Sequence, residues 1–196
     1  MFTKKNWTAI FSIFLILLLS GCTTNETNNI SNDDEDWLVN YSPVHFLGNG
    51  TDNFWIDYPI NHTNSSQKFT HLSWINDSLE EGCVLFVVHK TGCESCQPQA
   101  SRVIKLSKKY QEHIVFYDLD ITLGGLLEER AYDSYLYDPD GPPGYIALTG
   151  ILTLINNSGT MEFGWHSWEF DVDFKEMEEW LKDGIYYWYQ NNGELQ

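Results

Sequence analysis

Alternating apolar and polar positions divide the chain beyond residue 70 into helices and strands. Residues 71–81 place Leu72, Ile75 and Leu79 at helical spacing, which predicts a short amphipathic helix. The continuously apolar and β-branched run 83–89 predicts a strand that is buried on both faces. A glycine turn follows this strand, and a second helix is expected at 97–110 because its apolar and lysine positions separate onto two faces.

The second half of the domain continues the same alternation. Residues 114–121 predict another strand, and 152–156 and 161–165 predict two strands joined by a short polar turn as an antiparallel hairpin. Residues 174–189 predict a closing helix with four apolar residues on one face. A strand, a helix and a second strand in succession imply a parallel pair with a right-handed crossover. The whole pattern indicates an α/β domain over 70–196.

The N-terminal segment has the pattern of an export signal rather than of a folded element. Two lysines, Lys4 and Lys5, precede an apolar run at 9–19 that is too short to span a bilayer comfortably. The sequence Leu-Ser-Gly-Cys that ends at Cys22 resembles the lipobox of prokaryotic lipoproteins. That resemblance implies a signal peptide over 1–21, a lipid on Cys22 and a membrane-anchored, extracytoplasmic protein. An uncleaved anchor is the alternative.

Residues 22–69 are expected to form a tether followed by an irregular extension. The stretch 23–36 contains a single apolar residue, Ile30, and cannot bury enough surface to offset the entropy of ordering. The remainder contains several aromatic residues and is expected to pack on the domain as irregular or short-stranded structure. Beyond the expected signal, Asn-x-Ser/Thr acceptors start at eight asparagines, which indicates either an N-glycoprotein or compositional bias: Asn25, Asn29, Asn40, Asn49, Asn61, Asn64, Asn76 and Asn156.

Charge and composition narrow the class of partner. The 196 residues include 28 acidic and 11 basic side chains, for a net charge of -17. This excess excludes nucleic acid as the default partner, because a phosphate-binding surface needs clustered Lys and Arg. Removal of the signal would take away Lys4 and Lys5, so that 9 basic residues against 28 acidic residues give -19. We expect a soluble, monomeric domain.

The core resembles the thioredoxin-like family. The resemblance covers about residues 70–189 and depends on the order of elements and on the sequence Cys93-Glu94-Ser95-Cys96 after the first buried strand. It implies a thioredoxin-like fold, in which helices flank a central mixed sheet. It also implies that the partners are proteins that carry disulfides or dithiols, and that no cofactor is needed.

Cys93 and Cys96 are the candidate catalytic residues. Two intervening residues at a helix start put both sulfurs within disulfide reach, and the helix N-terminus favours a thiolate at Cys93. Cys93 would attack a substrate disulfide and Cys96 would resolve the mixed disulfide. A zinc site would need two further ligands at matching spacing, which the sequence lacks. A structural disulfide is the stronger alternative, although so short a loop gains little entropy from closure. Cys83 is expected to be an inert core thiol.

The sequence departs from the family at three positions. Gly92 stands where the family usually has Trp, and Val87 stands where a buried acid is common. The alignment before the hairpin puts Leu152 at the position of the substrate-contacting cis-proline, so that Gly92, Ile151, Leu152 and Thr153 are expected to form the substrate groove. These departures support an alternative function as a non-catalytic binding or redox-sensing module with a structural disulfide.

The sequence has two further features, an insert and a histidine near the end of the hairpin. Residues 123–144 form an insert before the expected cis-proline position, with a short helix and an aromatic, proline-rich turn. It is expected either to fold toward the Cys93 edge and select the partner or to be a surface loop packed by its own tyrosines. His166 lies near two tryptophans and is expected to be a packing residue rather than an acid-base group.

Overall fold

A four-stranded mixed sheet forms the centre of the molecule. The computed structural model describes residues 36–65 and 67–193, so the expected signal and Cys22 lie outside the described residues. The strands lie in the order β4-β3-β5-β6, with β3 (Cys83–His89) parallel to β4 (Ile114–Asp120). β5 (Leu148–Asn157) runs antiparallel to β3 and to β6 (Thr160–Glu169). The predicted β-α-β unit and hairpin are therefore both confirmed.

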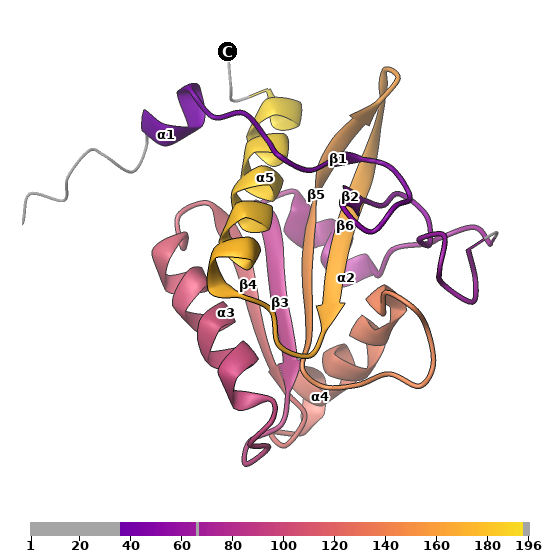
Figure 1. Cartoon of the computed structure of the whole chain (residues 1–196), viewed down its shortest axis with the longest axis vertical. Helices are drawn as coiled ribbons and strands as arrows, with labels where there is room; N and C mark the ends of the chain where they lie inside the picture. Colours follow the sequence, from indigo (N-terminus) through magenta and orange to yellow (C-terminus); the bar gives the residue numbers. More distant parts are fainter. Residues whose placement is uncertain (1–35, 66, 194–196) are drawn as a thin grey trace, which may run out of the picture.

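Helices cover both faces of this sheet. Figure 1 shows α3 (Gln97–Lys109) and α5 (Phe174–Asn192) on one face and α2 (Ser73–Leu79) and α4 (Gly125–Asp133) on the other. Every residue of β3 is buried, as its continuous apolar run predicts. The layers and strand order define a thioredoxin-like α/β fold, which confirms the predicted fold class.

The hairpin strands are longer than the pattern of the sequence predicts. β5 and β6 have ten residues each, whereas five were expected for each. Gly150 lies inside β5, where a Cβ atom would come within 2.4 Å of the Phe86 ring, so glycine here marks a close approach and not a loop. Gly164 has the same role in β6 against Ile155, whose Cδ1 atom would lie 2.0 Å from such a Cβ. Gly150 lies outside the strand predicted at 152–156, so the sequence pattern placed the start of β5 four residues too late.

The N-terminal extension is attached to α5 through a buried carboxylate. The extension contains α1 (Asp36–Val39) and the two-residue strands β1 (Phe46–Leu47) and β2 (Asn53–Phe54). Asp183 is completely buried and accepts hydrogen bonds from the Tyr41 hydroxyl at 2.6 Å and from the His45 backbone N–H at 2.8 Å. Burial and the hydrogen bond to Asp183 raise the pKa of Tyr41. These bonds hold the extension on the domain.

The insert contributes to the core, which the sequence did not indicate. After α4, a 3₁₀ helix, η1 (Ser134–Tyr137), carries Tyr137 into the interior, where it is completely buried. The Tyr137 ring contacts Phe69 and Trp165 at centroid distances of 5.5 Å each. Part of the insert is therefore a structural element rather than a surface loop packed only by its own tyrosines.

Candidate functional site

The two candidate cysteines form a disulfide at the end of β3. Cys93 and Cys96 are bonded to each other, with their Cα atoms 5.4 Å apart, in the turn between β3 and α3. Cys93 is partly exposed, whereas Cys96 is completely buried. Only the Cys93 sulfur can therefore react with a partner from solution, either as the attacking thiolate or as the sulfur that is attacked.

The start of α3 gives the disulfide its electrostatic environment. Cys96 is the N-cap residue of α3, and its side chain makes no capping hydrogen bond. The helix carries no acidic residue in its first turn and has Lys108 and Lys109 in its last turn. The unpaired N–H groups and the positive end of the dipole stabilise negative charge at this terminus. A thiolate at Cys93 would be favoured after reduction.

Asp120 holds the loop that leads to Cys93, and the sequence analysis missed it. This buried carboxylate at the end of β4 accepts hydrogen bonds from the Thr91 backbone N–H at 3.1 Å and from the Thr122 hydroxyl at 2.7 Å. Burial opposes ionisation, but the hydrogen bonds from Thr91 and Thr122 outweigh it and lower the pKa of Asp120. An acid at the end of a predicted strand, two residues before Thr122, was the available signal.

His89 is a second polar group beside the redox turn. It is the last residue of β3, is 6% exposed, and its Nε2 atom lies 2.6 Å from Asp118 Oδ1 on β4. Its Nδ1 atom is buried and has no hydrogen-bond partner among the described residues. A histidine at the end of an otherwise apolar run was the signal for this group in the sequence.

Gly92 has the conformation that its position in the turn requires. Its φ of +82° lies in the left-handed region, where residues with a Cβ atom are disfavoured. A Cβ atom at Gly92 would meet nothing within 4 Å, so the backbone conformation and not crowding selects glycine. The exposed backbone of Gly92 lies directly beside Cys93.

The expected groove residues Ile151, Leu152 and Thr153 do not line a groove. All of them are completely buried in the interior of β5, and Leu152 pairs with Val84 near the start of β3. The prediction was wrong because β5 begins at Leu148, four residues before Leu152, and Leu148 pairs with Val88 near the redox edge. Leu152 is therefore far along the strand from the disulfide.

The residue that directly precedes β5 is Ala147. The Ile146–Ala147 peptide bond is cis, and the Ala147 carbonyl accepts a hydrogen bond from the Phe170 N–H at 2.9 Å. Ala147 is buried directly before β5, five residues before Leu152. The sequence contains no proline at 147 that could have revealed this register.

Gln99 connects the redox helix to the sheet and to the loop before α5. The side chain is completely buried in α3, and its Nε2 donates to Thr149 Oγ1 at 2.8 Å. Its Oε1 accepts from the Val172 N–H at 2.9 Å. Because Gln99 lies three residues after Cys96, these bonds fix the start of α3 against β5 and the 170–173 loop.

Two positions of β3, Val87 and Cys83, bear on the chemistry of the disulfide. Val87 is completely buried and pairs with Thr149 across the sheet, so this position supplies no carboxylate that could relay a proton to Cys96. Cys83 is free and completely buried at the other end of β3, and burial raises the pKa of its thiol. Cys83 is thereby unreactive toward partners in solution.

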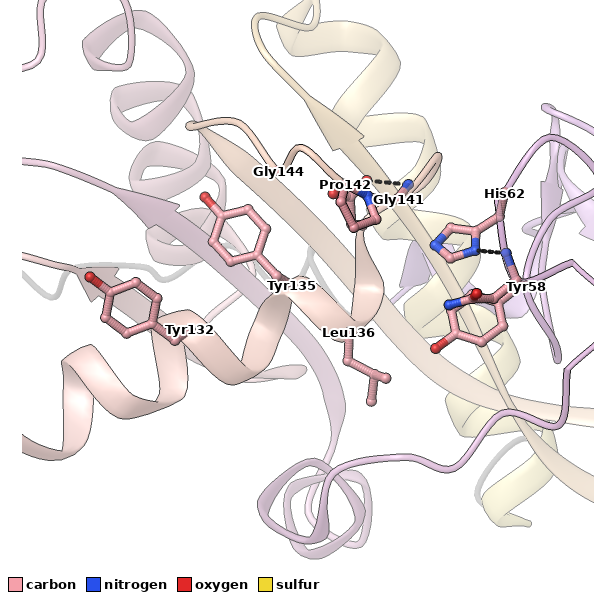
Figure 2. A pocket seen from close by; sticks show the side chains of 10 residues that line it. Tyr58, His62, Tyr132, Tyr135, Leu136, Gly141, Pro142 and Gly144 are labelled. Atoms are coloured by element: carbon pink, nitrogen blue, oxygen red, sulfur yellow. Dashed lines mark hydrogen bonds between the residues drawn. The ribbon is translucent and has the colours of Figure 1, made fainter.

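The insert and the extension enclose a cavity of about 500 Å³. Tyr132 and Tyr135 of the insert lie on one side, and the stacked rings of Tyr58 and His62 lie on the other, with a ring-centroid distance of 4.1 Å within the stack (Figure 2). Burial lowers the pKa of His62. The lining contains neither cysteine of the disulfide, so this cavity is separate from the redox turn.

No helix in the described residues combines the length and apolar character that a membrane crossing would require. No protein-family model matches the chain, and no curated protein sequence matches it.

Solved structures give only distant similarities. Thioredoxin O2 from Arabidopsis thaliana, in its oxidized state, shares 18% identity over 62% of this chain and 96% of its own, with a TM-score of 0.36. A chain from a structure of the thiol resolving mechanism in yeast mitochondrial 1-Cys peroxiredoxin shares 13% identity over 62% and 98%, with a TM-score of 0.37. The Drosophila melanogaster thioredoxin Deadhead shares 15% over 62% and 93%, with a TM-score of 0.35. At this level of similarity, the strand order and register of the chain itself define the fold.

Proposed function

We propose that this protein catalyses thiol–disulfide exchange through Cys93 and Cys96. The observation that carries the proposal is the asymmetry of the disulfide: Cys93 is partly exposed beside a helix N-terminus, and Cys96 is buried in the same turn. The exposed Cys93 sulfur can form a mixed disulfide with a partner, and the buried Cys96 sulfur can then attack Cys93 and release that partner.

The exchange follows from these positions. In the reduced protein the Cys93 thiolate attacks one sulfur of a substrate disulfide, and the other substrate sulfur leaves as a thiolate and takes up a proton. The Cys96 thiol then loses its proton and attacks Cys93 Sγ, which releases the second substrate thiolate. The substrate gains two electrons, and the dithiol loses two as the Cys93–Cys96 disulfide forms. The same steps in reverse oxidise a substrate dithiol.

The location of the protein belongs to the same proposal. The Leu-Ser-Gly-Cys sequence at Cys22 supports a lipid anchor, with the domain on the extracytoplasmic face of the membrane. The exposure of Asn49 and Asn61 in the extension and of Asn156 in the domain is compatible with glycosylation. Metabolic labelling with a radioactive fatty acid tests the anchor: the label is expected on wild type and is expected to be lost in Cys22→Ser.

Reduction of insulin by the dithiothreitol-coupled turbidity assay tests the proposed exchange. Wild type should accelerate reduction, Cys93→Ser should fall to the uncatalysed rate, and Cys96→Ser should accumulate a mixed disulfide that a non-reducing gel resolves. Cys83→Ala is the matched control, because this buried thiol lies outside the exchange, and it should keep the wild-type rate. Equal rates for wild type and Cys93→Ser would contradict the proposal and favour a structural disulfide.

A further inference from the structure

A second cavity, of about 470 Å³, lies at the end of β6 between the extension, the insert and the start of α5. Its volume falls in the range of sites that bind small molecules or single side chains. The lining combines aromatic and acidic side chains, which are Trp55, Trp168, Phe170, Asp52, Asp140, Glu169 and Glu176. No Lys or Arg is present among the described residues that line it.

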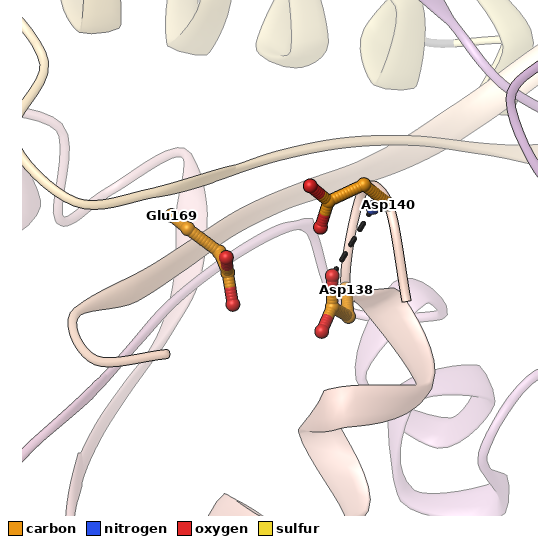
Figure 3. Close-up of side chains that lie close together, drawn as sticks. All are labelled: Asp138, Asp140 and Glu169. Atoms are coloured by element: carbon orange, nitrogen blue, oxygen red, sulfur yellow. Dashed lines mark hydrogen bonds between the residues drawn. The ribbon is translucent and has the colours of Figure 1, made fainter. Parts of the chain in front are cut away.

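Two carboxylates that line this cavity, Asp140 and Glu169, lie close to Asp138, which lines the first cavity. Asp138, Asp140 and Glu169 each offer an oxygen, and these oxygens all lie within 4.8 Å of one another (Figure 3). No side-chain ion pair joins any of these three groups to a Lys or Arg in the described part of the chain. Burial, and then the charges of Asp138 and Asp140, raise the pKa of Glu169 to about 7. Backbone N–H groups of Tyr145 and Gly141 donate to Glu169 and Asp138, but no Lys or Arg side chain among the described residues is paired with the cluster.

His166 presents a further acceptor to the cavity. It is 3% exposed, and its Nδ1 must donate to the Asn53 carbonyl at 2.9 Å because a carbonyl oxygen only accepts. Burial lowers the pKa of His166 to about 3, so the ring is neutral and Nε2 carries a lone pair. Nε2 has no hydrogen-bond partner among the described residues. Trp180 stacks on the ring at 3.6 Å and Trp55 lies at 4.3 Å, so the ring edge is the part that reaches the cavity.

The remaining lining suits an apolar stem. The rings of Trp55, Trp168 and Phe170 form much of the wall, and the face of an aromatic ring attracts a cation. Ile60 and Phe170 are 63% and 55% exposed, so the cavity opens onto an apolar rim. Carboxylates, a histidine lone pair and aromatic faces are all complementary to a positively charged donor on a hydrocarbon chain.

We propose that this cavity binds a lysine or arginine side chain of the protein whose disulfide Cys93 exchanges. The inference rests on the proposed function for its partner, but the cavity chemistry stands independently of it. Lys and Arg carry the donor, the positive charge and the alkyl stem that the lining fits. The net charge of -17 adds a field that attracts basic partners.

The position of the cavity allows one partner to reach both sites. Glu169 pairs with Leu148, which pairs with Val88 one residue before the end of β3, so the cavity and the redox turn lie at the same end of the sheet. β6 is two strands away from β3, which corresponds to about 10 Å across the sheet. This is the separation of the strands, and Cys93 lies four residues beyond the end of β3, so a partner needs a short extended segment of about three residues or more to connect the sites. A basic residue a few positions from the reacting cysteine would satisfy both sites.

Direct binding to the oxidised protein tests the site without requiring exchange. The probes are N-acetyl-lysine amide and its neutral analogue N-acetyl-norleucine amide, followed by the shifts of the tryptophan indole N–H signals in NMR spectra. We expect saturable shifts of Trp55 and Trp168 with the lysine amide and weak shifts with the norleucine amide. Glu169→Gln and Asp140→Asn should each weaken lysine binding by about fivefold.

The control is Glu162→Gln, which removes the same charge from the same strand outside the cavity lining and should leave lysine binding unchanged. Equal shifts with the lysine and norleucine amides would overturn the proposal. Tighter binding of choline would assign the cavity to a quaternary ammonium instead, and saturable Ca²⁺ binding with no lysine binding would assign it to a metal. Either result would also overturn it.

A separate experiment tests whether lysine binding in this cavity promotes thiol–disulfide exchange at Cys93. Two cystine peptides that differ only in Lys against norleucine, three residues from the cystine, are compared in reduction by wild type and by Glu169→Gln. The lysine peptide should have a higher kcat/KM by about fivefold with wild type, and the advantage should disappear in the variant. Equal rates for both peptides would overturn the link while leaving exchange intact. Lysine binding without reduction of either peptide would overturn the proposed function alone.

Discussion

The environment of Cys93 depends on residues outside the Cys-x-x-Cys pattern. Asp120 fixes the Thr91 backbone on one side of the turn, and Gln99 fixes the start of α3 on the other side. Both act on the backbone that positions the sulfur and not on the sulfur itself. Their side chains are buried, so the cost of leaving their polar atoms unpaired keeps these bonds in place.

Substitution of Gly92 tests whether its backbone conformation supports both stability and exchange. Gly92→Ala should destabilise the protein by about 1–2 kcal/mol, because the φ of +82° disfavours a Cβ atom, although there is space for one. It should also slow insulin reduction, since the turn that presents Cys93 shifts. Urea unfolding and the turbidity assay measure the two effects.

Gly159 supplies the matched control for that variant. Its φ is +91°, a Cβ atom would likewise meet nothing within 4 Å, and it lies in the hairpin turn away from the disulfide. Gly159→Ala should lose similar stability and keep full activity. If both variants kept full activity, the conformation of Gly92 would have no bearing on exchange.

The sequence allowed Cys93 and Cys96 to be predicted, because spacing and position after a buried strand determine their roles. It did not reveal Asp120 or Gln99 as supports, since their partners lie 29 and 50 residues away in the chain. The expected groove residues Ile151, Leu152 and Thr153 lie inside β5 instead, because this strand starts four residues earlier than the sequence pattern predicts.

At the scale of elements, the insert joins the core through η1. Tyr137 is enclosed by rings from the extension, from β3 and from β6, and its hydroxyl lies 3.1 Å from His71 Nδ1. Ser167 on β6 donates to the Tyr137 carbonyl. Deletion of the whole insert would therefore remove core packing as well as any role in partner selection.

Truncation of Tyr137 tests that account of the insert. Tyr137→Ala should destabilise the protein by about 3–5 kcal/mol through loss of buried ring contacts, whereas Tyr137→Phe should cost about 1 kcal/mol through loss of the hydroxyl. Tyr132→Ala is the control, since this side chain on α4 is 61% exposed and should cost little. Thermal unfolding of wild type and the three variants measures these differences. Equal stability of Tyr137→Ala and Tyr132→Ala would show that the Tyr137 ring does not stabilise the core.

The helices and the buried strand β3 were predictable because their periodicity depends on local sequence alone. The start of β5 and the end of β6 were not, and for β5 the reason is that Gly150 serves a close approach to Phe86 that only the tertiary structure creates. The small β1–β2 pair was anticipated only as short-stranded structure. Its position depends on Asp183 in α5, which lies more than 130 residues further along the chain.

For the whole molecule, the acidic cluster at Glu169 should make stability depend on pH. Burial, followed by repulsion from Asp138 and Asp140, raises the pKa of Glu169 from 4.5 to about 7 in the folded state. The folded protein therefore holds this proton more tightly than the unfolded chain does. The contribution of Glu169 to the free energy of unfolding is therefore fully present below about pH 4.5 and is lost as the pH rises through about 7.

Comparison with Glu169→Gln isolates this effect from the other titrating groups. The free energy of unfolding of wild type should fall relative to Glu169→Gln as pH rises from 5 to 8, as measured by urea unfolding at each pH. Glu162→Gln, which changes a carboxylate at the other end of β6, should run parallel to wild type over that range. A constant difference between wild type and Glu169→Gln would contradict the account.

The reduction potential of the Cys93–Cys96 pair distinguishes a site of thiol–disulfide exchange from a structural disulfide. Equilibration of the protein with dithiothreitol or glutathione buffers, followed by alkylation and mass spectrometry, gives the fraction of disulfide at each poise. Exchange requires a potential above about −300 mV, with Cys93 as the first thiol to be alkylated in the reduced protein. A potential well below that value, with no alkylation of Cys93, would identify a structural disulfide and contradict the proposed function.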